Sequence, residues 1–265
     1  MTTFLLGAAD PEMRRIEEIL RENGQEVRYA ERDGKRCHPG NAYQCDGIDG
    51  VIRVECAPIG IHNADIDHHR PGDPGYGLPA SNFWEASSLG QIYKFLGLKN
   101  PSQDDVVLSA MDHNPAGAIR GECPGVSAQD VIDRKVSEIS AATKASPGEV
   151  RERIRFMSER LESAPEIVIG GQSLKDLRQH DNGVGYSLDL LTSQVATLAG
   201  GYAVLLLTHD REGGAAKWTV GGHATPECIE AFKSKWAPAH GLAGIYGVPS
   251  RGYAGGYLPE KEGKA

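Results

Sequence analysis

The sequence predicts an α/β protein built around a mostly parallel sheet flanked by helices, with a second, smaller α/β domain after it. Short apolar runs typical of buried strands alternate with longer segments in which apolar residues recur at helical spacing, and this alternation is typical of parallel sheets. Acidic or imidazole side chains also follow three of the predicted strands directly. Ligands bind at that edge of open α/β sheets, so the same pattern predicts where a functional site lies.

The first two predicted elements are a strand at residues 4–6 and the helix that follows it. Asp10 is a favourable N-cap residue, and Pro11 suits the first helical position. Apolar residues at positions 13, 16 and 20 recur on one helical face, and Gly24 supplies the end of the helix. The segment therefore predicts a strand, a tight turn and a helix.

Two further strands and one helix complete the first predicted domain. Residues 51–54 form an apolar run that leads into Glu55, and residues 106–108 form another that leads towards Asp112. Between them, Asn82 is followed three residues later by a glutamate, a capping pattern that predicts the start of a helix. Both strands thus end in acidic side chains.

The remainder of the chain predicts a helical bridge and a second domain. Two helices without an intervening strand begin near Ser127 and Ser146. The later predicted elements are a strand at 167–169, a helix at 188–198, a hairpin with strands at 202–207 and 217–220 and a turn at 212–214, and a helix capped by Thr225. The predicted boundaries are residues 1–125 for the first domain, 126–164 for the bridge and 165–265 for the smaller C-terminal domain.

Composition narrows the class of partner and the compartment. The 265 residues carry a formal net charge of −8 and no basic stripe, so we expect no long nucleic acid as partner. Five cysteines, odd in number and without a CxxC pair, favour a reducing compartment, here the cytoplasm. We also expect no membrane partner, because no apolar run approaches the roughly 20 residues that span a bilayer. A small anionic substrate is compatible with this charge where a metal supplies positive charge, and homo-oligomerisation stays open.

The sharpest motif is Asp67-His68-His69, which follows the apolar Ile66 and lies between Glu55 and Asp112. In motif order, roughly the first 125 residues resemble the DHH phosphoesterase superfamily. The resemblance implies a parallel-sheet catalytic domain, a smaller C-terminal domain, and phosphoesterase, pyrophosphatase or exonuclease activity dependent on Mn²⁺ or Mg²⁺. A weaker likeness to the glycine-rich histidine motif of the C-terminal domain in that superfamily covers residues 221–223.

The resemblance also implies roles for individual residues. The implied metal ligands, for one or two ions, are Asp10, Glu12, Glu55, His68 and Asp112. Asp67 would orient the histidines, and His69 would contact the scissile phosphate or act as general acid. Two divalent ions held in this way clamp a phosphate and lower the pKa of a water between them.

The sequence departs from the superfamily pattern at three positions. Leu6 stands where the first motif normally has a histidine, and glutamates replace aspartates at positions 12 and 55. Each added methylene moves a carboxylate by more than about 1 Å. We therefore expect two metal sites of unequal strength, unless His38 or His62, in polar loops beside the second strand, replaces the missing imidazole.

Further polar residues are candidates for binding the substrate. They are His113, Gly221, Gly222, His223, Arg251, Lys35 and Arg36. Backbone amides at 221–223 would cradle a phosphate at a helix N-terminus, and Arg251 would add a bidentate contact. Structural interpretations stay open: a helix cap for Asp10, a solvated strand end for Glu55, capping for Asp112 and His113, and surface turns for residues 35–36, 180–183, 208–211 and 221–223.

The leading functional hypothesis is a metal-dependent phosphohydrolase. It would act on a small phosphorylated substrate, such as a nucleotide or a short oligonucleotide, in a cleft between the two domains. One alternative is a DHH-like nucleotide-binding protein that has lost hydrolysis. The other is a metal-dependent enzyme of different chemistry, because a fold does not determine a function.

Overall fold

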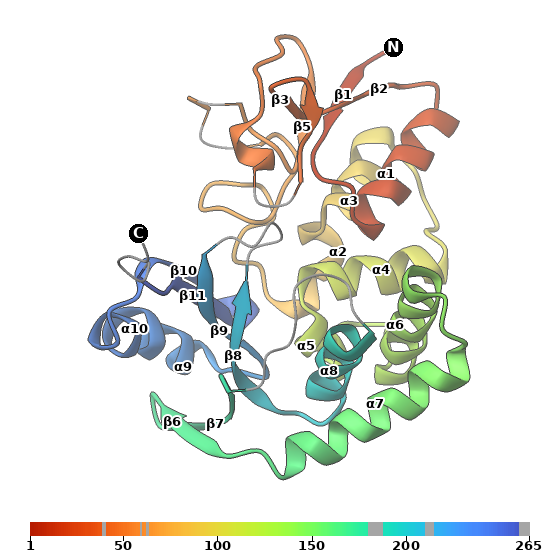
Figure 1. Ribbon diagram of the computed structural model, residues 1–265. Coiled ribbons are helices and arrows are strands. Elements are labelled where there is room, and N and C mark those ends of the chain that lie inside the picture. Colours follow the sequence, from red (N-terminus) through yellow and green to blue (C-terminus); the bar gives the residue numbers. More distant parts are fainter. Residues whose placement is uncertain (39–40, 59, 62–63, 180–187, 210–214, 260–265) are drawn as a thin grey trace. The chain divides into compact units, whose positions relative to one another are not determined.

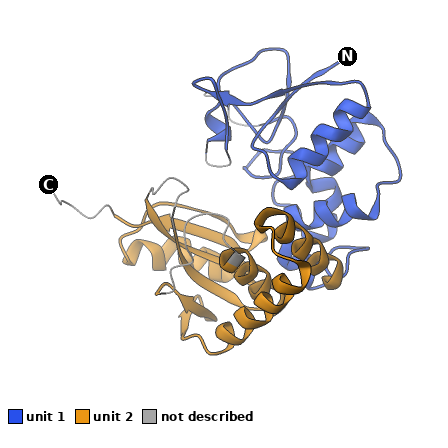
Figure 2. Ribbon diagram, turned by 45° about the vertical axis from the view of Figure 1, so that its right-hand side comes forward, with its two compact units in different colours: residues 1–127 blue, residues 128–265 orange. Residues whose placement is uncertain are grey.

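The computed structural model describes residues 1–38, 41–58, 60–61, 64–179, 188–209 and 215–259 (Figure 1). The chain divides into two compact units, residues 1–127 and 128–265 (Figure 2). Both contain helices and strands, so the α/β class is confirmed. The helices at 128–143 and 147–162, predicted as a bridge, belong to the second unit.

The first unit contains a parallel sheet of three strands in the order β2-β1-β5. Its strands are β1 (Thr3–Leu6), β2 (Glu26–Tyr29) and β5 (Ile52–Val54), and a short antiparallel pair, β3 (Glu31–Arg32) and β4 (Lys35–Arg36), lies between them in sequence. Helix α1 (Pro11–Glu22) follows β1, and the Asp10 side chain accepts the backbone N–H of Met13 at 2.7 Å. The predicted strand, tight turn and helix are thus confirmed.

The helices after β5 differ from the sequence prediction. They are α2 (Phe83–Ala86), α3 (Ser88–Leu96), α4 (Gln103–His113) and α5 (Pro115–Ile119), with single 3-10 turns at Ala42–Gln44 and Ala80–Asn82. Ser87, rather than Asn82, supplies the side-chain cap, which accepts the N–H of Gly90 at the start of α3. The boundary prediction failed because the chain turns sharply at Ser87 and divides one expected helix into two.

The strand predicted at residues 106–108 is wrong, because these residues lie inside α4. The Ser102 hydroxyl accepts the N–H of Asp105, and two acidic residues occupy the first turn, where they favour a helix. A run of three apolar residues cannot distinguish a strand from a buried helical segment. Asp112 therefore comes from the last turn of a helix and not from the end of a strand.

Apolar side chains from β1, α1, β5, α3 and α4 pack into the main core of this unit. The buried members include Phe4, Leu6, Met13, Ile16, Leu20, Val54, Leu89, Ile92 and Leu108. Leu6 is fully buried. The core fixes the ends of β1 and β5 and the first turns of α1 and α3 against one another.

The second unit contains a six-stranded mixed sheet in the order β10-β11-β9-β8-β7-β6. The strands are β6 (Glu166–Ile169), β7 (Gln172–Leu177), β8 (Ala203–His209), β9 (Ala216–Gly222), β10 (Ala243–Val248) and β11 (Tyr253–Tyr257). Only β7 and β8 pair in parallel among the described strands of this sheet. The mostly parallel description therefore holds for the first unit alone, and the second unit, expected to be smaller, carries the larger sheet.

The helices of the second unit are α6 (Ala128–Thr143), α7 (Pro147–Glu162), α8 (Leu188–Ala199), α9 (Pro226–Ala231) and α10 (Ala237–Ala239), with a π-helical turn at Phe232–Trp236 and a 3-10 turn at Pro249–Arg251. Ser146 caps α7 in a complete capping box, as its sequence predicts. The predicted hairpin is the antiparallel pair β8 and β9, and its turn at 212–214 lies outside the described residues.

Two further observations concern the helices and the cysteines. None of the helices in the described part of the chain is both long and apolar enough to cross a membrane. All five cysteines, which fall within the described ranges, are buried free thiols.

Candidate metal centre

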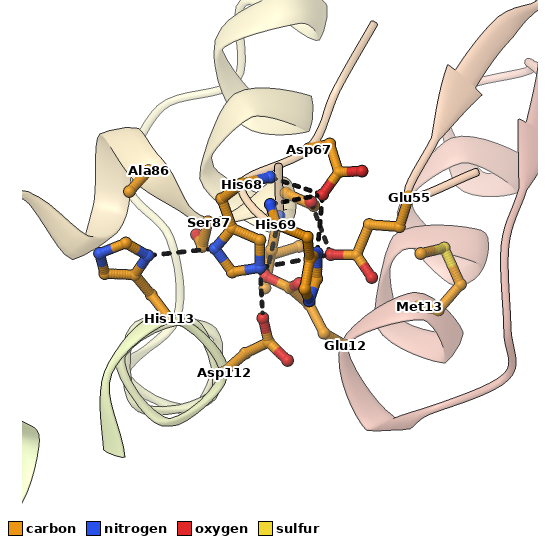
Figure 3. A network of polar contacts seen from close by, with 12 residues as sticks. Glu12, Met13, Glu55, Asp67, His68, His69, Ala86, Ser87, Asp112 and His113 are labelled. Atoms are coloured by element: carbon orange, nitrogen blue, oxygen red, sulfur yellow. Dashed lines mark hydrogen bonds and ion pairs between the residues drawn. The ribbon is translucent and has the colours of Figure 1, made fainter. Parts of the chain in front are cut away.

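Four segments of the first unit bring acidic and imidazole side chains to one place (Figure 3). Glu12 comes from the first turn of α1, Glu55 follows β5, and Asp112 comes from the last turn of α4. His68 follows Ile66, which forms an isolated parallel bridge with Val54 of β5. The pairing next to Val54 explains how a loop residue reaches the same end of the sheet as Glu55.

The ligand atoms of Glu12, Glu55, His68 and Asp112 all lie within 4.8 Å of one another. The Nε2 atom of His68 is 2.9 Å from the Asp112 Oδ2 atom and 3.6 Å from the Glu55 Oε1 atom. The distance between His68 and Asp112 is inside the roughly 5 Å that two ligands of one ion require. Three carboxylates and one imidazole thus converge as a metal site would need.

A second, overlapping group contains Glu55, His68 and His69, whose ligand atoms meet the same 4.8 Å limit. Glu55 and His68 belong to both groups; a carboxylate such as Glu55 can bridge two ions, whereas the single lone pair of a neutral imidazole binds one. The first group could hold an ion with four protein side chains; with His68 engaged there, the second retains Glu55 and His69.

Asp67 organises the loop rather than entering either group. Its Oδ1 atom accepts the backbone N–H groups of His68 and His69 at 2.6 and 3.0 Å and lies 2.7 Å from the His69 Nδ1 atom. Its Oδ2 atom accepts the hydroxyl of Tyr43 at 2.6 Å. Burial acts to raise the pKa of Asp67, but the hydrogen bonds from His69 and Tyr43 hold it below its usual value. Because the His69 Nδ1–H faces this anion, the His69 Nε2 atom is left as the reactive position.

His113 lies behind His68, with the two Nδ1 atoms 3.1 Å apart. The Nε2 atom of His113 is 2.9 Å from the carbonyl oxygen of Leu78. His113 is fully buried, so it does not offer the surface that its predicted contact with substrate requires. The structure instead makes it a neighbour of a metal-ligand candidate.

The acidic side chains of the centre repel one another when they are ionised together, because they lie close to one another and largely away from solvent. Burial, followed by the charge of Asp112, raises the pKa of Glu12 well above its usual range. Burial likewise raises the pKa of Glu55 to about 8 and, together with the charge of Asp112, that of Asp10 to about 6. A cation among these carboxylates would relieve the repulsion.

Two residues at the start of α3 hold the glutamates in position. The Leu89 backbone N–H donates to the Glu12 Oε1 atom at 3.0 Å, and the Ser88 hydroxyl donates to the Glu55 Oε1 atom at 2.7 Å. The other oxygen of Glu12, Oε2, is buried and accepts no hydrogen bond from the described residues. A buried carboxylate oxygen of this kind suits a metal ligand.

The backbone around the centre is tightly constrained. Glu55 has a left-handed conformation with φ of 50°, an arrangement that costs free energy and clusters at functional sites. A Cβ atom at Gly7 would approach the Glu55 carbonyl oxygen to 2.4 Å, and one at Gly75 would approach the His68 Cβ atom to 2.8 Å. Both glycines are therefore needed for close approach of the chain.

The sequence did not single out Tyr43, Ser88 or Gly75. Tyr43 follows Lys35 and Arg36, the two residues of this region that the sequence predicts to bind substrate. Lys35 and Arg36 are exposed on β4, where the Arg36 guanidinium lies 3.8 Å from the Tyr29 ring centroid. The available signal for Tyr43 was only its nearness in sequence to Lys35 and Arg36.

The remaining predicted residues have structural partners in their own regions. Asp10 caps α1 and feels the charges of Asp112 and His69, but it belongs to neither metal group. His38 is exposed, and its backbone N–H donates to Asn41. His62, proposed as a substitute ligand, and residues 180–183 and 210–211 lie outside the described residues.

The candidates in the second unit are engaged within that unit. Gly221 and Gly222 pair with β8, and a Cβ atom at Gly222 would approach the Tyr202 carbonyl oxygen to 2.3 Å. The backbone N–H of His223 donates to that same oxygen, and its Nε2 atom lies 2.8 Å from the Leu198 carbonyl oxygen. The His223 N–H therefore does not face outward to cradle a phosphate. Arg251 ends the 3-10 turn, with its guanidinium 5.8 Å from the Tyr253 ring centroid.

Comparison with known proteins finds no matching family model, no similar curated protein and no similar solved structure.

Proposed function

We propose that this protein is a divalent-metal-dependent phosphohydrolase that acts on a small phosphorylated substrate such as a nucleotide or a short oligonucleotide. The observation that carries the proposal is the convergence of Glu12, Glu55, His68 and Asp112 within 4.8 Å of one another. They are four of the five residues, all but Asp10, for which the likeness to the DHH phosphoesterases implies metal binding. Sequence motif and side-chain geometry thus support the same centre.

The donor set fits Mn²⁺ or Mg²⁺. Carboxylate oxygens suit both ions, and the imidazole of His68 suits Mn²⁺ better. The otherwise unpartnered Oε2 atom of Glu12 and the raised pKa values of Glu12 and Glu55 are consistent with a cation at this place. When bound, such ions would supply an activated water and neutralise charge on the substrate phosphate.

His69 is the residue best placed to move a proton. Its Nδ1–H is held by Asp67, which directs the Nε2 atom away from that carboxylate and stabilises the ring when it is protonated. The side chain is 32% exposed, whereas His68 is fully enclosed. When no second ion is bound to its Nε2 atom, His69 would donate a hydrogen bond to the phosphate or a proton to the departing oxygen.

The acidic character of the chain supports dependence on a metal. Asp67, Glu12 and Glu55 are buried beside the histidines, so an anionic phosphate would be repelled unless a cation lay between. We also propose a cytoplasmic location, which the five buried free thiols support.

The test is a screen of phosphorylated metabolites, nucleotides and short oligonucleotides with Mn²⁺, in which released phosphate is measured. We expect at least one substrate whose turnover falls on the order of 100-fold or more in His68→Ala. The loss of a metal ligand should reduce activity more than the roughly 10- to 100-fold typical of losing a residue that only contacts a ligand. His240→Ala, which changes an exposed histidine of the second unit, is the matched control and should retain activity.

Two outcomes would redirect the proposal. Binding of Mn²⁺ and a nucleotide without release of phosphate would favour the non-hydrolytic alternative. Failure of the wild-type protein to bind any divalent ion would reject the metal centre itself.

A further inference from the structure

We propose that His113 is a positioning residue that fixes the tautomer of His68 and thereby makes the centre favour ions that accept an imidazole ligand over Mg²⁺. The inference rests on the metal centre of the proposed function and adds a residue that the resemblance does not assign. It follows from a chain of three groups, Leu78, His113 and His68, whose contacts favour one arrangement of protons when both rings are neutral.

The first step concerns the outer end of this chain. A carbonyl oxygen only accepts hydrogen bonds, so the His113 Nε2 atom, 2.9 Å from the Leu78 oxygen, carries a proton. In the neutral ring, the His113 Nδ1 atom is then an acceptor. The backbone of Leu78 thus determines which nitrogen of His113 can receive a hydrogen bond.

The second step concerns His68. Its Nδ1 atom lies 3.1 Å from the His113 Nδ1 atom, and with an acceptor at His113 it is the His68 nitrogen that carries the proton. The lone pair of His68 then lies on Nε2, the atom that is 2.9 Å from Asp112 and 3.6 Å from Glu55. A metal ligand needs its lone pair at that position.

The surroundings keep the two rings in this relation. Both histidines are fully buried, and their rings lie 5.3 Å apart between centroids with an interplanar angle of 28°, close to the common plane that a hydrogen bond between the two Nδ1 atoms requires. The His69 ring lies edge-on to His68 at 4.5 Å, and the backbone at Gly75 closes on the His68 Cβ atom. The ring therefore has little freedom to turn.

The alternative tautomer shows what His113 prevents. With its proton on Nε2, His68 would donate a hydrogen bond to the Asp112 Oδ2 atom across the same 2.9 Å. That bond would occupy two ligand atoms of the centre at once. By accepting a hydrogen bond from the other nitrogen, Nδ1, His113 disfavours this closed arrangement.

The consequence is selective for the kind of ion. Mg²⁺ is bound chiefly by oxygen ligands, whereas Mn²⁺ and the later divalent metals gain more from imidazole. Weakening the His68 Nε2 donor should therefore reduce affinity for Mn²⁺ more than affinity for Mg²⁺. The ratio of Mn²⁺ to Mg²⁺ affinity therefore tests the role of His113. A general loss of stability would not change this ratio.

The experiment is calorimetric titration of the full chain with Mn²⁺ and with Mg²⁺. We expect His113→Phe, which keeps a ring but has no acceptor, to weaken Mn²⁺ binding about 10- to 100-fold and to lower the ratio of Mn²⁺ to Mg²⁺ affinity. His113→Gln carries both an acceptor and a donor and should stay within about threefold of the wild-type protein. His113→Leu provides the same comparison if phenylalanine prevents folding.

Asp105→Ala is the matched control in the same helix. Its buried carboxylate accepts hydrogen bonds from Arg15, Tyr93 and Ser102, so the change should lower stability while leaving the affinity ratio unchanged. The role assigned to His113 would be overturned if His113→Phe bound Mn²⁺ with wild-type affinity or lost affinity equally for both ions. The proposed function would then still stand. A wild-type protein that binds neither ion would overturn the proposed function and this assignment together.

Discussion

Replacing Glu55 by glutamine should stabilise the metal-free protein and weaken its metal binding. Burial raises the pKa of Glu55 from 4.5 to about 8, so the folded state holds a proton that the unfolded chain releases at lower pH. Each tenfold change in an ionisation constant corresponds to about 1.4 kcal/mol. Ionising the folded residue therefore costs up to about 5 kcal/mol more than ionising the unfolded one.

The sign of the pH dependence follows from the raised pKa. The contribution of Glu55 to stability is fully present below pH 4.5 and is lost as the pH rises through about 8. Glutamine does not ionise and keeps a carbonyl oxygen that can accept the Ser88 hydroxyl. The difference in free energy of unfolding between Glu55→Gln and wild type should thus be small near pH 4.5 and favour the variant by several kcal/mol near pH 9.

The assay is urea denaturation with a chelator at intervals from pH 4.5 to 9. Glu22→Gln, at an exposed position on α1, makes the same chemical change outside the centre and should show no such trend. With Mn²⁺ at about 100 times its dissociation constant, the wild-type protein should gain about 2.7 kcal/mol, and Glu55→Gln should gain less. A stability difference that does not change between pH 5 and pH 9 would refute the reasoning.

Two further predictions concern the number of ions and the support of the histidine loop. Titration with Mn²⁺ should show one tight site and one weaker site per chain, because Glu12, Glu55, His68 and Asp112 can hold one ion together and, with His68 engaged there, only Glu55 and His69 of the second group remain; two equally tight sites would contradict this order. Tyr43→Phe removes the hydroxyl that donates to Asp67 at 2.6 Å and should lower the free energy of unfolding by roughly 1.5–3 kcal/mol, as expected for a hydrogen bond to a charged group. An unchanged urea midpoint would show that this bond contributes nothing.

Local signals explain the elements that the sequence predicted correctly. Asp10 and Pro11 predict the start of α1, and Ser146 predicts α7, because an N-cap acts within three residues of the chain. The apolar run at 106–108 has no comparable signal inside it, and the Ser102 cap that decides its conformation lies four residues earlier. The wrong strand at this place led to the wrong origin for Asp112, although not to the wrong residue.

The candidate site shows the same division between local and tertiary information. Motif order sufficed to select Glu55, His68 and Asp112, which the fold brings together. The partners of these residues depend on contacts that no local pattern contains. Tyr43 reaches Asp67 across 24 positions, and His113 reaches His68 across 45. Their roles follow from hydrogen-bond geometry, which only the folded chain displays.

The first turn of α3 accounts for two departures from the superfamily pattern together. Positions 12 and 55 carry glutamate where the resemblance leads one to expect aspartate, and the longer side chains reach neighbouring groups of one helix, the Leu89 N–H and the Ser88 hydroxyl. The positive end of the α3 dipole also favours carboxylates at this place. An aspartate at either position would be a methylene shorter and would withdraw from α3 or from the cluster. The lengths of both glutamates therefore fit their hydrogen bonds to α3. The effect of a substitution at position 12 on metal binding should be measured with Glu55 unchanged, and the reverse.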